Sequence, residues 1–307
     1  LSRGGRQPTT TTTATSSHMA RGGYCGLGVM GAPMARHLAA AGHEVSVYNR
    51  TAARALEWVA ANGGQAFPTP AEVARESDTV FLCVGNDDDV RQVILGDGGI
   101  LDGAHEGLVI VDHTTTSAEL AQDMARSCEA HGVVFIDAPV SGGQAGAENG
   151  VLTVMCGSSS EVTFDETALL IGAYSRSCVR MGGPGTGQLT KMVNQICIAG
   201  LVQALSEGVA FAANAGLDPY LVIDVISKGA AQSWQMDNRA RTMVDDKFDF
   251  GFAVEWMVKD LGFVVDEARS NGSQVPVTEQ VLSYYRELVE LGRGRYDTSS
   301  LVTRLPR

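Results

Sequence analysis

Residues Gly26-Leu27-Gly28-Val29-Met30-Gly31 form a GxGxxG stretch, and this stretch decides the fold. A short apolar segment at Gly23–Cys25 precedes it, and helical sequence at Pro33–Ala41 follows it. In such a strand–turn–helix unit the first glycine makes the tight turn, the second lets the backbone approach a pyrophosphate, and the third lets helix and strand pack closely. The amides at the helix N-terminus attract the phosphates. We therefore expect all six residues to bind a dinucleotide.

Outward from this stretch, short apolar segments alternate with helical ones as far as Gly183. Further helices are expected at Ala52–Asn62 and Ser117–His131. Apolar, β-branched strands separated by helices are typical of a buried parallel sheet. The sequence thus predicts an α/β fold, with a Rossmann-type doubly wound parallel sheet over residues 21–183. The other expected strands are Glu44–Tyr48, Thr79–Val84, Leu108–Asp112, Val133–Asp137, Leu152–Cys156 and Cys178–Met181.

After Gly182–Gly185 the alternation of strand-like and helical segments ends, and helical segments follow one another. The segment Gly187–Ala215 has no proline and carries apolar residues at helical spacing, which predicts a single helix roughly 40 Å long. A helix of this length suits the spine of a helical domain or a subunit interface. We predict an all-α substrate and dimerisation domain over residues 184–307, joined through this interdomain helix, in a homodimer or homotetramer. Shorter helices are expected at Pro219–Lys228, Gly251–Asn271 and Val277–Leu291.

Composition narrows the class of protein. The chain has 307 residues, of which 44% are hydrophobic, and a net charge of −12. The negative charge argues against a nucleic-acid partner or an anionic membrane surface, and no unbroken apolar run approaches the roughly 18–20 residues of a membrane span. The six cysteines form no CxxC pair, which favours reduced thiols and a cytoplasmic location. Residues 1–20, rich in Ser, Thr and Arg, are expected to be a disordered, non-native extension; a targeting peptide is the alternative.

The end of the second expected strand bears on the choice of cofactor. A carboxylate there would bind the ribose 2′-hydroxyl of NAD and repel a 2′-phosphate. This chain has the neutral Asn49, followed by Arg50, which can pair with a phosphate, and Thr51, which can donate a hydroxyl. The pattern predicts NADP as the preferred cofactor, with NAD possible. The alternative is that Arg50 is only a solvated residue at a helix start.

Four ordered blocks resemble the β-hydroxyacid dehydrogenase family. They are Gly26–Gly31 with Pro33–Ala35, Asp137–Gly143 followed by Gly146–Ala147 and Gly150–Thr153, Gly185–Gln195, and Lys259–Leu261. Their order and spacing cover nearly the whole chain from Gly23 onward, which is far more specific than any single block. Gly85 stands where the family commonly has proline, and His113 stands where it commonly has serine. These departures leave the substrate subgroup open.

The resemblance implies a role for each matching position. Lys191 would be the catalytic lysine. Ser141, Gly142 and Gly143 would hold the substrate carboxylate. Lys259 would close over the cofactor from the helical domain. The substrate-binding set is completed by Asn194, Phe252 and Asp260, and the cofactor-binding set by Val84, Gly85, Asp89 and Thr115.

These residue types suit hydride chemistry. Oxidation of a hydroxyl group requires removal of its proton as hydride leaves the carbon, and a lysine whose pKa is lowered by burial can accept that proton. Lys191 lies in apolar helical sequence, and Asn194 and Gln195 follow it at i+3 and i+4 on the same helix face. Without the other blocks, Lys191 would read as a surface lysine on an amphipathic helix.

Other patterns have structural explanations. The run Asp87–Asp89 resembles a metal-binding cluster, but acids also favour a helix N-terminus, and we expect no metal site. Thr114–Thr116 can be a helix N-cap run before Ser117, and Ser141–Gly143 can be a plain turn.

The sequence therefore predicts an NADP(H)-preferring oxidoreductase that interconverts a small β-hydroxyacid and its semialdehyde or keto form. An NAD-dependent 3-hydroxyisobutyrate dehydrogenase is the close alternative. An imine reductase and a non-catalytic dinucleotide-binding scaffold are alternatives of other classes. Lys191 counts against the first of these, and the set of Ser141, Lys191 and Asn194 counts against the second.

Overall fold

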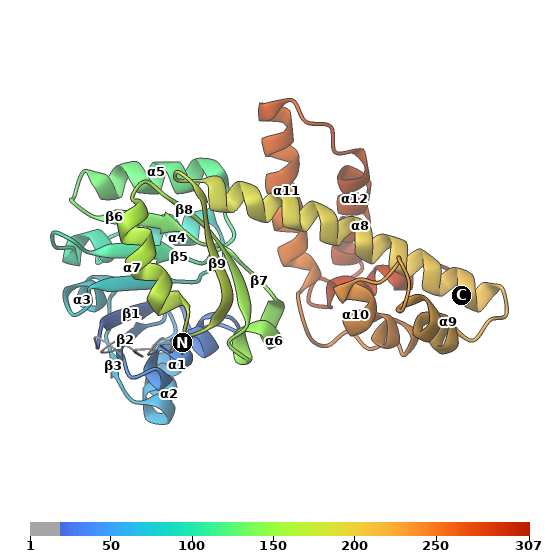
Figure 1. Ribbon diagram of the computed structural model, residues 1–307, viewed down its shortest axis with the longest axis horizontal. Helices are drawn as coiled ribbons and strands as arrows, with labels where there is room; N and C mark the ends of the chain where they lie inside the picture. The colour runs from blue at the N-terminus through green and yellow to red at the C-terminus, as the bar shows by residue number, and fades with distance from the viewer. Residues whose placement is uncertain (1–18) are drawn as a thin grey trace, which may run out of the picture.

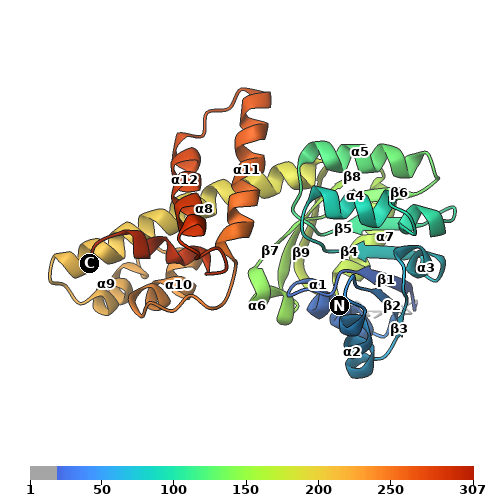
Figure 2. The ribbon, with the colours of Figure 1, turned by 180° about the vertical axis from the view of Figure 1, so that it is seen from behind.

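The computed structural model describes residues 19–307, so the expected extension at residues 1–20 lies almost entirely outside the described residues. Two units are visible in Figure 1, a sheet flanked by helices and a helical unit, with helix α8 (Thr186–Asn214) running from one into the other. The view from behind in Figure 2 shows the same division. The predicted fold class, a Rossmann-type sheet followed by an all-α part with a long connecting helix, is confirmed.

The sheet has the strand order β3-β2-β1-β4-β5-β6, which is the usual order of a dinucleotide-binding fold, continued by β8 and β7 with β9 paired to β8. The first six strands are all parallel. The strands are β1 (Arg21–Cys25), β2 (Glu44–Tyr48), β3 (Gln65–Ala66), β4 (Thr79–Leu82), β5 (Val109–Asp112), β6 (Val134–Asp137), β7 (Val140–Ser141), β8 (Leu152–Ser158) and β9 (Ser175–Gly182).

The expectation of a wholly parallel sheet is wrong for its last strands. β8 pairs antiparallel with both β6 and β7, while β9 is parallel to β8. The reason lies between β6 and β8, where the chain forms β7 and the short helix α6 (Gly143–Glu148) instead of a long crossover helix. Without a crossover that returns the chain to the opposite edge, the next strand runs backwards.

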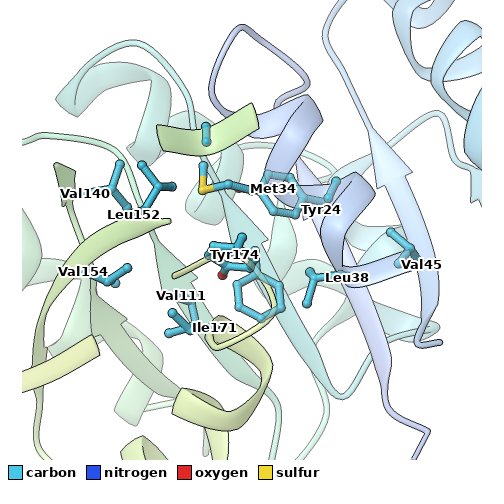
Figure 3. Packing of buried hydrophobic residues seen from close by; sticks show 14 of the residues in the cluster. Tyr24, Met34, Leu38, Val45, Val111, Val140, Leu152, Val154, Ile171 and Tyr174 are labelled. Carbon is cyan, nitrogen blue, oxygen red and sulfur yellow. The ribbon is translucent and has the colours of Figure 1, made fainter. Parts of the chain in front are cut away.

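Helices cover both faces of the sheet because side chains alternate along each strand. On one face Tyr24, Phe81 and Val111 pack with helices α1, α2 and α7, as Figure 3 shows in part. On the other face Cys25, Leu82 and Ile110 pack with α3, α4 and α5. The bounds are α1 (Gly31–Ala40), α2 (Ala52–Asn62), α3 (Pro70–Arg75), α4 (Asp87–Leu95), α5 (Ala118–Glu129) and α7 (Glu161–Ile171), with a 3₁₀ turn η1 at Ile100–Gly103.

The C-terminal unit packs around α8. The predicted helix Gly187–Ala215 is confirmed within one residue at each end. The helix expected at Gly251–Asn271 begins only at Val254, because Gly251 has a left-handed φ of +75° and the amide of Phe252 donates to Asp297 instead of joining a helix. The remaining elements are α9 (Pro219–Ile226), α10 (Trp234–Val244), α11 (Val254–Asn271), α12 (Pro276–Glu290) and a 3₁₀ helix η2 (Thr298–Arg304).

By length and composition alone, α8 could cross a membrane, with a mean hydropathy of 1.7 over its most apolar window, of which 39% is buried. The sequence expectation considered only unbroken apolar runs, and so it did not identify this helix as long and apolar enough to cross a membrane. Contacts with both units explain the apolar composition of α8 equally well. The helix touches β8 and α5 at one end and α10, α11, α12 and η2 along the rest. It is the shared core helix of the two units.

The glycine-rich first strand has a packing cause. A Cβ on Gly23 would lie 2.5 Å from Cγ1 of Val73, so glycine there lets α3 lie directly against β1. The neighbouring Gly22 has room, since its nearest atom would be 3.8 Å away.

This difference gives a matched test of stability. Gly23→Ala should lower the free energy of unfolding by about 1–3 kcal/mol, because the added methyl group overpacks the contact between α3 and β1. Gly22→Ala, one residue away in the same strand, should change it much less. Denaturant titration measures both, and equal effects of the two substitutions would contradict the packing explanation.

Candidate active site

The glycine-rich turn between β1 and α1 is shaped for a phosphate-bearing ligand. Gly26 has a φ of +97°, and a Cβ there would collide with the carbonyl of Cys83. A Cβ on Gly31 would collide with the carbonyl of Gly26, whereas one on Gly28 would meet no atom within 4 Å. No side chain of the described residues caps α1, and its first turn has no acidic residue. The turn therefore leaves open space and an uncapped helix N-terminus, which fits a pyrophosphate.

The residues after β2 lie beside this turn. The Asn49 side chain faces inward, where its Oδ1 accepts a hydrogen bond from the Leu27 amide at 2.9 Å and its Nδ2 donates to the Thr51 carbonyl. Asn49 thus holds the glycine-rich turn in place. Arg50 is 87% exposed, and its Nη1 lies 3.3 Å from Oδ1 of Asp89. Arg50 is the residue of this group that is free to meet a ligand in solvent.

Lys259 on α11 ties the helical unit to the sheet. Its Nζ donates to the carbonyl oxygens of Gly85, at 2.9 Å, and Thr115, at 2.7 Å. These two carbonyls follow β4 and β5, and the carboxyl edge of parallel strands is where ligands bind in this type of sheet. The structure thus brings Val84, Gly85, Thr115 and Lys259 together along one cavity.

Lys191 lies in the second turn of α8 with its side chain buried. The residue is 7% exposed, and its Nζ donates to the carbonyl of Val140 at 2.9 Å. Burial lowers the pKa of Lys191 from 10.5 to about 8, the nearby negative charge of Asp260 opposes this shift, and the positive charge of Lys259 adds to it. An amine with a pKa near 8 exists in both protonation states close to neutrality.

A chain of hydrogen bonds connects the residues around Lys191. The Ser141 hydroxyl donates to Asn194, Asn194 Nδ2 donates to Gln195 Oε1 at 2.8 Å, and Gln195 Nε2 donates to Asp260 Oδ2 at 2.7 Å. Asp260 is buried, and burial raises its pKa. Within residues 19–307 its Oδ1 accepts no hydrogen bond, although Lys259 Nζ lies 3.5 Å away. The chain holds the amide of Asn194 and the charge of Asp260 at fixed places near the lysine.

Ser141, Gly142 and Gly143 form the turn into α6 beside this network. Gly142 and Gly143 both have positive φ angles, +133° and +62°, which favour glycine. In the part of the chain that the structure describes, no side chain caps the start of α6. The turn therefore places a serine and two glycines without side chains at the cavity wall, which suits a carboxylate.

These groups line one cavity of about 540 Å³ between the two units. Its walls include Lys191, Ser141–Gly143, Asn194 and Phe252. Of the predicted site residues, the glycine-rich turn contributes only Met30 to this cavity, and Asn49–Thr51 and Asp89 lie outside it. The arrangement separates a glycine-rich cradle, suited to phosphates, from a cavity with a basic amine and a carboxylate-sized turn.

Several side chains of the site escaped the sequence analysis. The Gln188 amide bridges α8 to the threonine run, donating to the Thr114 carbonyl at 2.8 Å and accepting from the Thr116 amide. Trp256 lines the cavity with its ring centre 5.6 Å from Lys259 Nζ. The only signal for Gln188 was its place in the Gly185–Gln195 block.

His113, which stands where the family commonly has serine, is explained by the hydrogen bonds of its buried ring. It is buried, its Nδ1 lies 2.7 Å from the Ala138 carbonyl, and its Nε2 lies 2.8 Å from the Tyr174 hydroxyl. Burial lowers the pKa of His113 to about 4, so the ring is neutral near pH 7. The donor from Tyr174 satisfies a ring nitrogen that would otherwise be buried alone.

The acidic run lies at a helix N-terminus, as considered above, whereas the cap of α5 is Ser117 and not a threonine of the run Thr114–Thr116. Asp87–Asp89 occupy the first turn of α4, whose N-cap is Asn86, and Ser117 is the N-cap of α5. Asp87 also accepts a hydrogen bond from the Ser117 hydroxyl at 2.6 Å.

Comparison with protein families divides the chain into two matching regions. A family described as the NAD binding domain of 6-phosphogluconate dehydrogenase matches residues 21–183. A second, described as the NAD-binding domain of NADP-dependent 3-hydroxyisobutyrate dehydrogenase, matches residues 185–305.

Individual proteins are similar over almost the whole chain. An uncharacterised oxidoreductase of Shewanella frigidimarina is 56% identical, covering 94% of this chain and 99% of that protein. The 2-hydroxy-3-oxopropionate reductase of Escherichia coli is 32% identical, covering 91% and 96% respectively. The solved structure of a 3-hydroxyisobutyrate dehydrogenase from Mycobacterium tuberculosis with L-serine is 27% identical, with a TM-score of 0.84 over 93% of this chain and 99% of that one. This chain therefore belongs to the β-hydroxyacid dehydrogenase family and is an NAD(P)-dependent dehydrogenase.

Proposed function

We propose that the enzyme interconverts a small β-hydroxyacid and its semialdehyde or keto form, prefers NADP(H), and uses Lys191 as general acid and base. The observation that carries the proposal is the buried amine of Lys191, which shares one cavity with the Ser141–Gly143 turn and with Thr115. A nicotinamide cofactor would supply the hydride acceptor or donor. The protein has to supply a proton acceptor and a carboxylate site.

Each of these needs is met by residues of the chain. In the oxidative direction the neutral amine of Lys191 accepts the hydroxyl proton, and in the reductive direction the ammonium returns it. The amides of Gly142 and Gly143 and the Ser141 hydroxyl hold the carboxylate. Because the amine is buried, its charge interacts strongly with a developing alkoxide.

The choice of NADP rests on Arg50. No carboxylate follows β2, since Asn49 stands there and is occupied by the Leu27 amide. The exposed guanidinium of Arg50 can pair with a 2′-phosphate, and its contact with Asp89 is a weak surface pair that a phosphate can replace. An NAD-dependent 3-hydroxyisobutyrate dehydrogenase remains the second candidate, because Asp89 lies within reach of Arg50 and neutralises part of its charge.

The two other classes considered are disfavoured by the same site. An imine reductase does not need a buried lysine amine beside a carboxylate turn. A scaffold that only binds the dinucleotide would not need the hydrogen-bond chain from Ser141 to Asp260.

The proposal includes self-association and a cytoplasmic location, with a small carboxylate as the only partner class and neither nucleic acid nor membrane. Exposed apolar side chains on α8, such as Val193 and Phe211, support a homodimer or homotetramer. The net charge of −12 supports the exclusion of anionic polymers.

Replacing the lysine tests the mechanism. Lys191→Met should lower the turnover number about 10²–10⁴-fold, because the proton acceptor is lost, while the affinity for NADPH stays within a few-fold. Initial rates at the absorbance of reduced nicotinamide and fluorescence titration of NADPH measure the two quantities. The exposed Lys247→Met serves as control. Turnover of Lys191→Met near the wild-type value would remove the lysine from the mechanism.

The dependence on pH has a defined sign. Hydroxyacid oxidation should rise as the pH passes through about 8, since only the neutral amine of Lys191 accepts a proton, and reduction should fall over the same interval. Asp260→Asn should move this midpoint to lower pH, because the lost negative charge had raised the pKa of Lys191. Profiles of kcat/KM test this, with the exposed Asp266→Asn as control. A midpoint shared by wild type and Asp260→Asn would contradict the coupling.

Cofactor choice can be tested at Arg50. Arg50→Asp should lower kcat/KM with NADP at least about 10-fold and favour NAD, since the carboxylate repels a 2′-phosphate and accepts from a 2′-hydroxyl. The same charge reversal at Arg126, on α5, controls for the change in net charge. An NADP-to-NAD ratio unaltered by Arg50→Asp would exclude Arg50 from cofactor selection.

A further inference from the structure

The cavity has a polar wall that the proposed chemistry does not use. Gln235 and Arg239 both line it from α10, four residues apart and therefore on one face of that helix. They belong to the helical unit, whereas the Ser141–Gly143 turn belongs to the sheet unit. A substrate whose carboxylate lies at the turn can thus meet a second polar group on the opposite side.

Gln235 contributes a buried side-chain amide to the cavity wall. The residue is 8% exposed, and its amide makes no hydrogen bond to any residue among those described, 19–307. Its nitrogen and oxygen are not sealed in the core, because the side chain lines the cavity. A buried amide is costly without a hydrogen-bonding partner, and here only a ligand or solvent in the cavity can supply one.

Arg239 is held rigidly and keeps one nitrogen free. Its side chain is 15% exposed, and its guanidinium carbon lies 5.0 Å from the ring centres of both Trp234 and Phe250. Nε donates to Asp297 Oδ1 and Nη1 donates to the Asn238 carbonyl, each at 3.0 Å. Within the described part of the chain Nη2 donates to no acceptor. A fixed guanidinium with a free edge is well suited to a carboxylate.

The ion pair with Asp297 does not prevent Arg239 from binding a carboxylate. The Asp297 carboxylate also accepts from the Phe252 amide, the Ser299 amide and the Ser299 hydroxyl, so its charge is shared among several donors. Gly251 lets the backbone pack closely against the pair, because a Cβ there would lie 2.0 Å from Asp297 Oδ2 and 2.9 Å from Arg239 Nη2. The ion pair with Asp297 therefore holds the guanidinium of Arg239 in one orientation and still lets it bind a ligand carboxylate.

We infer that Gln235 and Arg239 form a second carboxylate-binding site, which selects β-hydroxyacids that carry an additional carboxylate on the side chain of the reacting molecule. The inference rests on the proposed function, in which the first carboxylate lies at Ser141–Gly143. The guanidinium supplies charge and one N–H, and the Gln235 amide supplies another N–H. No proton or hydride moves at this second site.

Two 3-hydroxyacids form a matched pair of probes. 3-Hydroxyisobutyrate and 2-(hydroxymethyl)glutarate share the same reacting end and differ in that a methyl group is replaced by a propanoate arm. At equal ionic strength, the wild-type enzyme should oxidise the diacid with a kcat/KM at least about 10-fold above that of the monoacid, as expected for one added charge-assisted contact. A wild-type preference for the monoacid would overturn the inference.

Variants of residues on α10 test whether this helix causes the preference for the diacid over the monoacid. Arg239→Met and Gln235→Leu should each lower kcat/KM for the diacid about 10–100-fold through KM, while the value for the monoacid changes less than about 3-fold. Arg239→Lys should restore part of the preference. Arg241→Met, two residues along the same helix at an exposed ion pair with Asp224, should leave both values unchanged. An equal fall for both substrates in Arg239→Met would show a structural role only and contradict the inference.

A binding measurement separates this inference from the proposed function. Calorimetry of glutarate and butanoate against wild-type enzyme loaded with NADP⁺ should show tighter binding of glutarate, and Gln235→Leu should abolish the difference. If neither hydroxyacid is oxidised, the proposed function fails, but the binding result still decides the second site. Equal affinities of the two acids for the wild type would overturn it.

Discussion

The buried carboxylate of Asp137 determines where everything else in the site lies. It ends β6, and its two oxygens accept hydrogen bonds from the amides of Gly185, at 2.8 Å, and Gln188, at 3.0 Å. These amides belong to the start of α8 and have no partner within the helix, so the carboxylate caps them. Burial raises the pKa of Asp137 to about 6 and these amide donors oppose the shift. Lys191 follows Gln188 by three residues on the same helix. Because Asp137 fixes the start of α8, it also fixes the position of Lys191 relative to the sheet.

The same junction explains why Lys191 can be both buried and useful. α8 passes so close to β6 and β8 that a Cβ on Gly187 would collide with the carbonyl of Met155. This proximity carries the lysine amine to the Val140 carbonyl and away from bulk water. Asp260 and Lys259 arrive from α11 and have opposite effects on the pKa of the amine. The proton affinity of the amine is therefore a joint property of the sheet, α8 and α11.

The sequence predicted the parts of this arrangement that depend on local pattern. The glycine-rich turn, the length of α8 and the grouping of Lys191 with Asn194 all follow from spacing along the chain. The reversed direction of β8 could not be predicted in this way, because it depends on α6 being too short to act as a crossover. Nor could the inward orientation of Asn49, which depends on the Leu27 amide being within its reach. The sequence did not indicate Arg239 and Gln235 as site residues, because α10 has no motif. They reach the cavity only because α10 packs on α8.

The single passage of the chain through α8 has a consequence for how such an enzyme can diversify. The glycine-rich cradle precedes that helix, and the wall formed by α10 follows it. Substitutions on α10 can therefore alter which acid is accepted without disturbing the strands that hold the cofactor. New substrate ranges can therefore arise by substitutions on α10 alone, while the glycine-rich turn and the reacting lysine keep their sequence.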